Sequence, residues 1–364
     1  MTRLHGRLPA VLLMGLGTFL GLILLEGGAR LAALREERRQ GRLDRDLAGL
    51  KSPGPGAVVT LGQIIRKSPN PQVVYELRPR LDVRFAGGRL TTSDAGYRGA
   101  DVASPKPSRI FRLVGIGDSY MFGQGVSDDE AYLARLPPLM KSALHERSVE
   151  TVNLAVPGFN TVMEVALLRE RLARLEPDCI LIEIVGNDLD LPNFLWSAVD
   201  PWTLRRSFLA EFVSERLKRR GRSASIPGLS EAPRESEGSA ETFARDAAQV
   251  PPQYASMVGL PAFEKAIGDL GAMAADRRIP VLAVTHGVWF EEALLKTLSD
   301  HAIPVLVLRP ALRRRARALG APDYARSPLA LSLTDLHPSA LGHQAIAEEL
   351  APWLAARLTE RSPS

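Results

Sequence analysis

Short apolar runs alternate with longer amphipathic stretches over the last two thirds of the chain. The runs cover residues 110–116, the segment ending before Asn153, and residues 179–185, 279–284 and 303–308. Apolar runs of this length, closed by turn residues, are typical of buried strands, and residues 161–175 carry apolar side chains at helical spacing. Alternating strands and helices with short links predict a parallel sheet with helices on both faces and right-handed crossovers. We therefore expect a three-layer α/β/α sandwich around a five-stranded parallel sheet.

The N-terminus has a different pattern. Residues 8–25 are apolar except for Thr18 and carry no charge. At about 1.5 Å per residue, a helix of this length spans about 27 Å, close to the hydrocarbon thickness of a bilayer. The run is longer than the core of a usual signal peptide, and the following Gly27-Gly28-Ala29 is a poor cleavage site. We interpret residues 1–30 as an uncleaved membrane anchor, with a cleaved signal sequence and a soluble core helix as the alternatives.

The segments between the anchor and the sheet predict further parts. Residues 31–56 are charged and helix-prone until Pro53-Gly54-Pro55-Gly56, which indicates a juxtamembrane stalk. Residues 57–108 contain short β-type segments and are expected to form a small β-rich element. The main domain then covers residues 109–360. Within it, residues 222–257 are rich in Ser, Pro, Gly, Glu and Ala without a period, so we expect a flexible insertion, either a lid or a plain surface loop.

Composition excludes several classes of function. The chain of 364 residues is 45% hydrophobic and 24% charged, which is ordinary for a globular protein. The net charge of +5 is modest, and no nucleic-acid motif accompanies the basic clusters, so we expect no nucleic-acid partner. The single cysteine, Cys179, lies inside an apolar run and has no partner for an internal disulfide. No His, Cys or Asp cluster has metal-ligand spacing, and we expect neither a metal nor a cofactor.

The most informative residues lie where the first predicted strand of the sheet ends. Gly117-Asp118-Ser119-Tyr120 follows residues 110–116, and a serine on such a turn stands at the carboxyl edge of the sheet, where α/β sheets bind ligands. Asp335-Leu336-His337-Pro338 precedes the last predicted helix. A serine that needs a base and a histidine beside a carboxylate are parts of a nucleophilic hydrolase. The dinucleotide fingerprint and the Gly-x-Ser-x-Gly elbow are both absent around Ser119.

Gly158 follows the second strand and Asn187 the third. The ordered set of Ser119, Gly158, Asn187 and His337 resembles the SGNH (GDSL) hydrolase family over about residues 85–358, including residues 94–99 before the first strand. The resemblance implies a flavodoxin-like sheet, with Ser119 as nucleophile and His337 as base. It also implies an oxyanion hole made by the backbone N–H groups of Ser119 and Gly158 and by the Asn187 amide. Asp118 is expected to order the turn.

The residue that orients His337 departs from the family pattern. The usual aspartate lies three residues before the histidine, but that position is Thr334 here, and Asp335 lies two before. We predict that Asp335 orients the ring, with Thr334 or a distant carboxylate as alternatives. His286, at the end of the fourth strand, is the rival base.

These residues predict a serine esterase that attacks an acyl ester, with O-acetyl on a glycan or lipid as our first expectation, through an acyl-Ser119 intermediate. An O-acyltransferase using the same site is one alternative, and a non-catalytic glycan-binding or assembly module is another. More arginines follow the apolar N-terminal segment than precede it, which taken alone favours a cytoplasmic domain. The family resemblance implies an extracytoplasmic enzyme, and we expect a membrane-anchored protein with its catalytic domain on the periplasmic side.

Overall fold

The structure is a computed structural model, and it describes residues 7–47, 56–144, 147–196, 207, 209–210, 213, 229–231, 245–248, 250–286 and 292–359. The chain divides into two compact units. One unit joins Met1–Lys51 to Trp196–Ser230, and the other joins Ser52–Leu195 to Glu231–Ser364.

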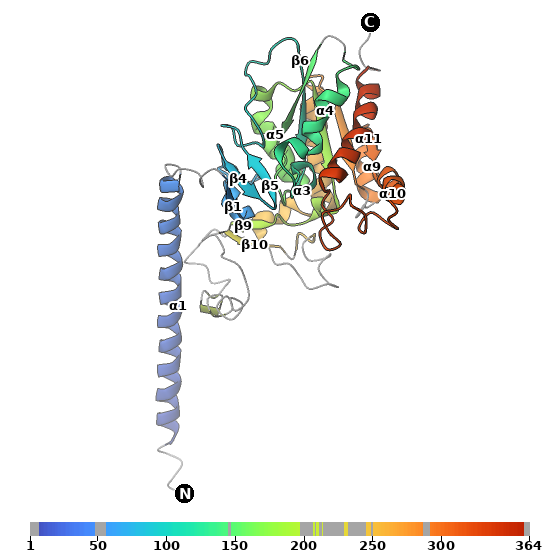
Figure 1. Ribbon diagram of the computed structural model, residues 1–364. Coiled ribbons are helices and arrows are strands. Elements are labelled where there is room, and N and C mark those ends of the chain that lie inside the picture. The colour runs from blue at the N-terminus through green and yellow to red at the C-terminus, as the bar shows by residue number, and fades with distance from the viewer. Residues whose placement is uncertain are drawn as a thin grey trace. The chain divides into compact units, whose positions relative to one another are not determined.

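The first unit contains one long helix, α1 (Arg7–Leu47), which runs without a break from the predicted anchor into the predicted stalk (Figure 1). Its segment Leu13–Ala32 has a mean hydropathy of 1.3 and no buried residue, so by length and composition it qualifies as a membrane span. Within the segment, Glu26 pairs with Arg30 at 2.9 Å and accepts a hydrogen bond from Ser207 at 2.8 Å. Two short strands, β9 (Phe194–Trp196) and β10 (Leu229–Glu231), lie near the limits of this unit in the sequence.

The second unit is built around five parallel strands in the order β12-β11-β8-β6-β7 (Figure 1). These strands are β6 (Ile110–Ile116), β7 (Ser148–Asn153), β8 (Cys179–Ile184), β11 (Val281–Thr285) and β12 (Val305–Val307). Val114 of β6 is in register with both Val152 and Ile180, so β6 is an inner strand that pairs on both edges. The predicted five-stranded parallel sheet is confirmed.

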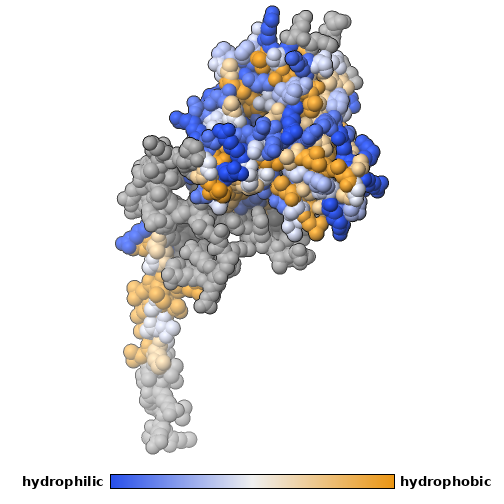
Figure 2. Space-filling model, viewed as in Figure 1, coloured by the Kyte–Doolittle hydropathy of each residue, from blue (hydrophilic) through white to orange (hydrophobic). Residues whose placement is uncertain are grey.

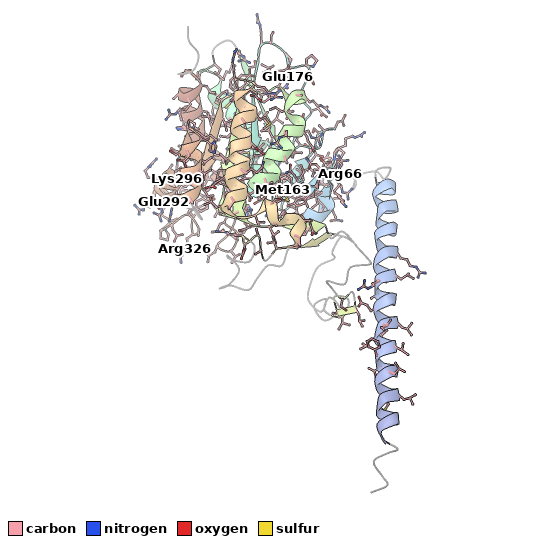
Figure 3. The ribbon with its side chains drawn as sticks, turned by 180° about the vertical axis from the view of Figure 1, so that it is seen from behind. Arg66, Met163, Glu176, Glu292, Lys296 and Arg326 are labelled. Carbon is pink, nitrogen blue, oxygen red and sulfur yellow. The ribbon has the colours of Figure 1, made fainter. Side chains whose placement is uncertain are left out.

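Helices cover both faces of this sheet. Val114 and Ile116 point to one face, where they share a hydrophobic core with α5 (Thr161–Leu175), α8 (Gly259–Ala275) and α9 (Glu292–Asp300). Gly115 points to the other face, against Leu133 of α4 (Tyr132–Met140). There α4 packs against α11 (Ala340–Thr359), which also contacts α10 (Arg309–Ala318). Seen from behind, Met163 of α5 and Lys296 of α9 lie on the same side of the sheet (Figure 3). The predicted three-layer sandwich is confirmed.

A small β-rich element lies where the sequence predicts β-type segments. It comprises a sheet of β1 (Ala57–Val59), β4 (Asp82–Phe85) and β5 (Gly88–Thr91), a hairpin of β2 (Ile65–Lys67) and β3 (Tyr75–Leu77), and the single turn α2 (Leu61–Ile64). Tyr75 is fully buried, and its hydroxyl donates to the Pro157 carbonyl at 3.0 Å. The Tyr75 ring also meets Phe159 edge-on, with centroids 5.2 Å apart. The element therefore supports the turn that carries Gly158.

Short helical turns follow several strands. They are α3 (Ser119–Phe122), η1 (Asp128–Glu130), η2 (Gly186–Leu189) and η4 (Pro252–Met257). Much of the predicted insertion 222–257 lies outside the described residues. Its C-terminal end differs from the expected flexible segment, because Val250, Tyr254 and Met257 are buried. These apolar side chains pack although the surrounding composition is polar.

Candidate active site

The turn after the inner strand β6 carries Ser119 at the carboxyl edge of the sheet. A Cβ atom at Gly117 would stand 2.9 Å from the Met121 Cβ and 3.0 Å from the Glu183 Cβ, so the chain turns in a space that only glycine fits. Asp118 caps α3, and its Oδ1 accepts the Tyr120 N–H at 3.0 Å. Ser119 is the first residue of the helix. The backbone of this capped helix therefore fixes the position of the Ser119 side chain.

Ser119, His337 and Asp335 form a hydrogen-bonded chain. The Ser119 Oγ lies 2.8 Å from the His337 Nε2, and the His337 Nδ1 lies 2.5 Å from the Asp335 Oδ1. The same Asp335 oxygen accepts the His337 backbone N–H at 3.1 Å. The Thr334 hydroxyl instead lies 3.3 Å from the Ser332 Oγ. The structure thus brings Asp335, and not Thr334, against the imidazole.

Hydrogen bonds within the loop that carries His337 hold the loop in place. The Leu331 N–H donates to the His337 carbonyl at 2.9 Å, and the Asp335 N–H donates to the Ser332 Oγ at 3.0 Å. Ser339 then begins α11, with its Oγ accepting the Gly342 N–H at 3.2 Å. The side chains of His337 and Asp335 are 20% and 43% exposed. Solvent therefore reaches the base and the carboxylate behind it.

The three predicted oxyanion donors stand around the same turn. Gly158 has a φ of 77°, and a Cβ there would lie 2.2 Å from the Asn193 Nδ2, so both conformation and space require glycine. The Val156 N–H donates to the Gly117 carbonyl at 3.1 Å and so joins the Gly158 turn to the nucleophile turn. Within the described part of the chain, the N–H groups of Ser119 and Gly158 have no protein acceptor.

Asn187 is held beside Asp118. Its Nδ2 donates to the Asp118 Oδ2 at 3.0 Å, and the same oxygen lies 3.1 Å from the Ser119 Oγ. The neighbouring Asp188 fixes η2 by accepting the Val185 N–H at 2.5 Å and the Thr161 hydroxyl at 2.7 Å. An amide nitrogen carries two hydrogens, which leaves a second donor for an oxyanion. Asp118 thus orders both the turn and the amide.

Glu183 is a member of the site that the sequence analysis missed. It is fully buried in β8, where its Oε1 lies 2.7 Å from the His286 Nε2 and accepts the Tyr132 hydroxyl at 3.0 Å. Its Oε2 accepts the Met121 N–H of the nucleophile turn. Burial raises the pKa of Glu183, while the bond from His286 opposes that rise. A single acid inside an apolar strand was the available signal, because such a group is retained only when it is hydrogen-bonded.

His286, the rival base, is placed away from this role by its bond to Glu183. Its ring centroid lies 4.7 Å from that of Tyr120, and the Tyr120 ring lies 4.8 Å from His337. Burial and the nearby carboxylates raise the pKa of the Tyr120 hydroxyl, which keeps it neutral. Across the described residues, no three His, Cys, Asp or Glu side chains are grouped to hold a metal ion.

Arg98, in the segment before the first strand of the sheet, contacts the end of the helical turn that carries Ser119. Its guanidinium donates to the carbonyls of Phe122, Gly123 and Val126 at 2.6, 2.8 and 2.7 Å. It also pairs with Asp128 at 2.8 Å, and its side chain is only 3% exposed. Three carbonyls at and just beyond the C-terminus of α3 are thus satisfied by one buried cation, which fixes the end of the helix that begins at Ser119.

Comparisons with known proteins identify the family of the chain. Residues 116–345 match the GDSL-like lipase/acylhydrolase family, which is more than half of the chain. Solved structures that resemble the chain include the alpha/beta hydrolase LAE5 from the metagenome of Lake Arreo, Spain, at 17% identity and a TM-score of 0.38, covering 67% of this chain and 94% of that one. Another is the psychrotrophic esterase EstA from Pseudoalteromonas sp., at 10% identity and a TM-score of 0.40, covering 68% of this chain and 98% of that one. A third is the lipase/acylhydrolase from Enterococcus faecalis, at 14% identity and a TM-score of 0.37, covering 68% of this chain and 96% of that one. A comparison with curated proteins gives no match. The chain belongs to the GDSL-like lipase/acylhydrolase family and is an ester hydrolase.

Proposed function

We propose that this protein hydrolyses an acyl ester, O-acetyl on a glycan or a lipid, through an acyl-Ser119 intermediate. The observation that carries the proposal is the hydrogen-bonded chain from the Ser119 Oγ through His337 to Asp335. A serine hydroxyl is a weak nucleophile until a base within hydrogen-bond reach accepts its proton. At 2.8 Å, the His337 Nε2 is within that reach.

In the first step, the His337 Nε2 takes the proton as the Ser119 Oγ attacks the ester carbonyl. The negative charge on the carbonyl oxygen is met by the N–H groups of Ser119 and Gly158 and by the Asn187 amide. The tetrahedral intermediate then breaks its bond to the alcohol, which leaves with the proton from Nε2. Asp335 accepts the Nδ1–H throughout and stabilises the imidazolium. Water, which gives its proton to the same Nε2, then attacks the acyl carbonyl. The bond to the Ser119 Oγ breaks, the Oγ takes the proton back from Nε2, and the acid is released.

The nucleophile is tested by labelling and by substitution. A fluorophosphonate should label Ser119, and Ser119→Ala should reduce hydrolysis of a panel of short acyl esters by about three orders of magnitude or more. Ser299→Ala, a change at an exposed serine of α9, is the control and should keep full activity. Labelling at another residue, or an active Ser119→Ala variant, would show that the assignment is wrong.

The second step separates a hydrolase from an O-acyltransferase, because both pass through the same acyl-enzyme. The exposure of Asp335 and His337 supports hydrolysis, since water reaches the base. The test is the partitioning of a chromogenic acetyl ester between free acetate and acetylated oligosaccharide acceptor at millimolar concentration. Mostly acetylated acceptor would favour the transferase. Absence of both products, together with unlabelled Ser119, would favour a non-catalytic binding module.

The chain organisation forms part of the same proposal. The apolar segment of α1 crosses the membrane as an uncleaved anchor, and the esterase domain that ends near residue 360 lies on the periplasmic side. The support is the length and composition of Leu13–Ala32. The support for the orientation is the implied extracytoplasmic role of the enzyme, against the arginines that follow the segment.

A further inference from the structure

A pocket of about 140 Å³ opens beside the histidine of the site. Its apolar wall is formed by Leu312, Ala325 and Leu336, together with the Tyr324 side chain. Leu336 separates Asp335 from His337 in the sequence, so the pocket adjoins the loop that carries the base. His286 also lines it, and the His286 ring contacts Tyr120, which contacts His337. The pocket therefore lies on the histidine side of the site.

The histidine side is where the alcohol part of an ester must lie. In the proposed reaction the His337 Nε2 returns its proton to the leaving alcohol oxygen, so that oxygen stands next to the imidazole. The carbonyl oxygen instead faces Gly158 and Asn187. This inference rests on the proposed function, because it uses the direction of that proton transfer.

Two arginines line the pocket without a neutralising partner among the residues that the structure describes. Arg309 begins α10 and Arg313 follows one turn later, and both are exposed. Of the residues that the structure describes, no Asp or Glu forms an ion pair with either. On the same helix, Arg314 and Arg315 behave differently: Arg315 pairs with Glu348 of α11 at 2.6 Å, and Arg314 lies 3.8 Å from Glu349.

Asp323, the one acid among the described residues of the pocket lining, is already neutralised. Asp323 pairs with Arg326, whose backbone N–H also donates to the Asp323 Oδ1 at 2.9 Å. Figure 3 shows Arg326 at the end of the domain where α5 begins, which is the carboxyl edge of the sheet. The side of the domain where α10 lies in Figure 1 shows hydrophilic residues next to hydrophobic ones in Figure 2. The pocket thus joins an apolar wall to two guanidinium groups that pair with no carboxylate in the described part of the chain.

We propose that this pocket selects esters whose alcohol part is a single ring carrying a carboxylate or a phosphate. A cavity of about 150 Å³ holds a benzene ring, so the volume here suits one ring and no more. Guanidinium groups recognise carboxylate and phosphate oxygens through paired, charge-assisted hydrogen bonds. The apolar wall takes the ring, and Arg309 and Arg313 take its anionic group.

The test compares matched esters on the full-length protein in non-ionic detergent. The anionic substrates are meta-acetoxybenzoate and meta-acetoxyphenyl phosphate, and meta-acetoxybenzamide is the neutral counterpart. Because both arginines are exposed, we expect a preference of about tenfold in kcat/KM for the anionic esters, falling as salt is added. A larger preference for the phosphate or for the carboxylate identifies which anion the pocket takes.

Two double variants carry the same change of charge on the same helix. Arg309→Gln with Arg313→Gln should reduce the preference to about one, through a loss of kcat/KM for the anionic esters. Arg314→Gln with Arg317→Gln, which removes two charges outside the pocket, should keep the preference. Equal rates for charged and neutral esters in the unmodified protein, or an equal loss in both double variants, would overturn the proposal while leaving the esterase intact.

Failure of the proposed function gives a different result. If no ester is hydrolysed, the dissociation constants of phenyl phosphate and benzoate still test the pocket by calorimetry. Binding that weakens about tenfold in the Arg309 and Arg313 double variant, and not in the control, supports the pocket. Binding that is absent or unchanged in that variant refutes it.

Discussion

The bond between Asp335 and His337 leads to a prediction that decides which residue orients the base. Replacing the carboxylate by an amide in Asp335→Asn keeps the size of the side chain and removes its charge. In the unmodified protein, the Asp335 Oδ1 accepts two N–H groups, the His337 Nδ1–H at 2.5 Å and the His337 backbone N–H at 3.1 Å. An asparagine that turns its Nδ2 toward the ring favours the tautomer with Nε2–H, which cannot accept the Ser119 proton.

The size of the loss follows from the exposure of the carboxylate. Changing a charge-assisted hydrogen bond into a neutral one costs about 1.5 kcal/mol, or roughly tenfold in rate. The wrong tautomer adds a further factor of about ten. The equivalent change in a triad with a buried aspartate costs about 10⁴-fold. Because the Asp335 side chain is 43% exposed and screened by water, we expect about 10²- to 10³-fold for Asp335→Asn.

The assay is kcat/KM for a chromogenic acetyl ester, measured on the full-length protein in detergent with matched circular dichroism spectra. Thr334→Ala is the control, because the Thr334 hydroxyl contacts only Ser332 among the described side chains. We expect its activity to stay within about twofold of the unmodified protein, as for most exposed substitutions. Equal and small losses in the two variants would refute the reasoning and mean that another group holds the imidazole.

Three further predictions follow from the described contacts. Gly158→Ala should lower kcat/KM by about 10- to 100-fold, because the new Cβ would displace Asn193. The control is Gly320→Ala, at a φ of 76° with open space around it. It should leave turnover intact, because it tests only the cost of the backbone conformation. Burial and the neighbouring Asp188 raise the pKa of Glu164, whose two oxygens have no hydrogen-bond partner among the described residues. The stability due to neutral Glu164 is complete below about pH 4.3 and is lost as the pH rises through the raised pKa. At pH 4, Glu164→Gln and the unmodified protein should therefore unfold at the same urea concentration. At pH 8 the variant should be the more stable of the two, by about 1–3 kcal/mol. Full-length protein should stay with membranes through high salt and alkaline washes, and a reporter fused after residue 45 should work only if it is a periplasmic type; release by salt, or activity of a cytoplasmic reporter, would contradict the proposed anchor or its orientation.

The sequence by itself determined the sheet and the residue types at its carboxyl edge. Strands buried on both faces are apolar along nearly their whole length, so residues 110–116 and 179–185 are recognisable without any structure. Ser119 and His337 stand out because few side chains can supply a nucleophile and a base that titrates near neutral pH. Each is also marked by a local feature, since Gly117 precedes the serine turn and Ser339 begins the last helix.

Contacts between distant segments were decided only by the tertiary structure. Spacing left Asp335 and Thr334 as alternatives, and the direction of the His337 ring separates them. Glu183 looked like part of an apolar run, yet it binds Met121 of the nucleophile turn, because parallel neighbours bring β8 beside β6.

The partners of charged residues outside the Ser119–His337–Asp335 triad were also decided only by the tertiary structure. Arg98 binds carbonyls more than twenty residues further along the chain, and a solvated surface arginine would have the same sequence signature. The sequence of α10 does not distinguish its arginines from one another, but α11 neutralises Arg315, whereas Arg313 lies beside the pocket. Periodicity reports which side of an element is buried, and it carries no information about which distant element covers that side; pairing, and with it the charge left free for a substrate, is fixed only when the layers assemble.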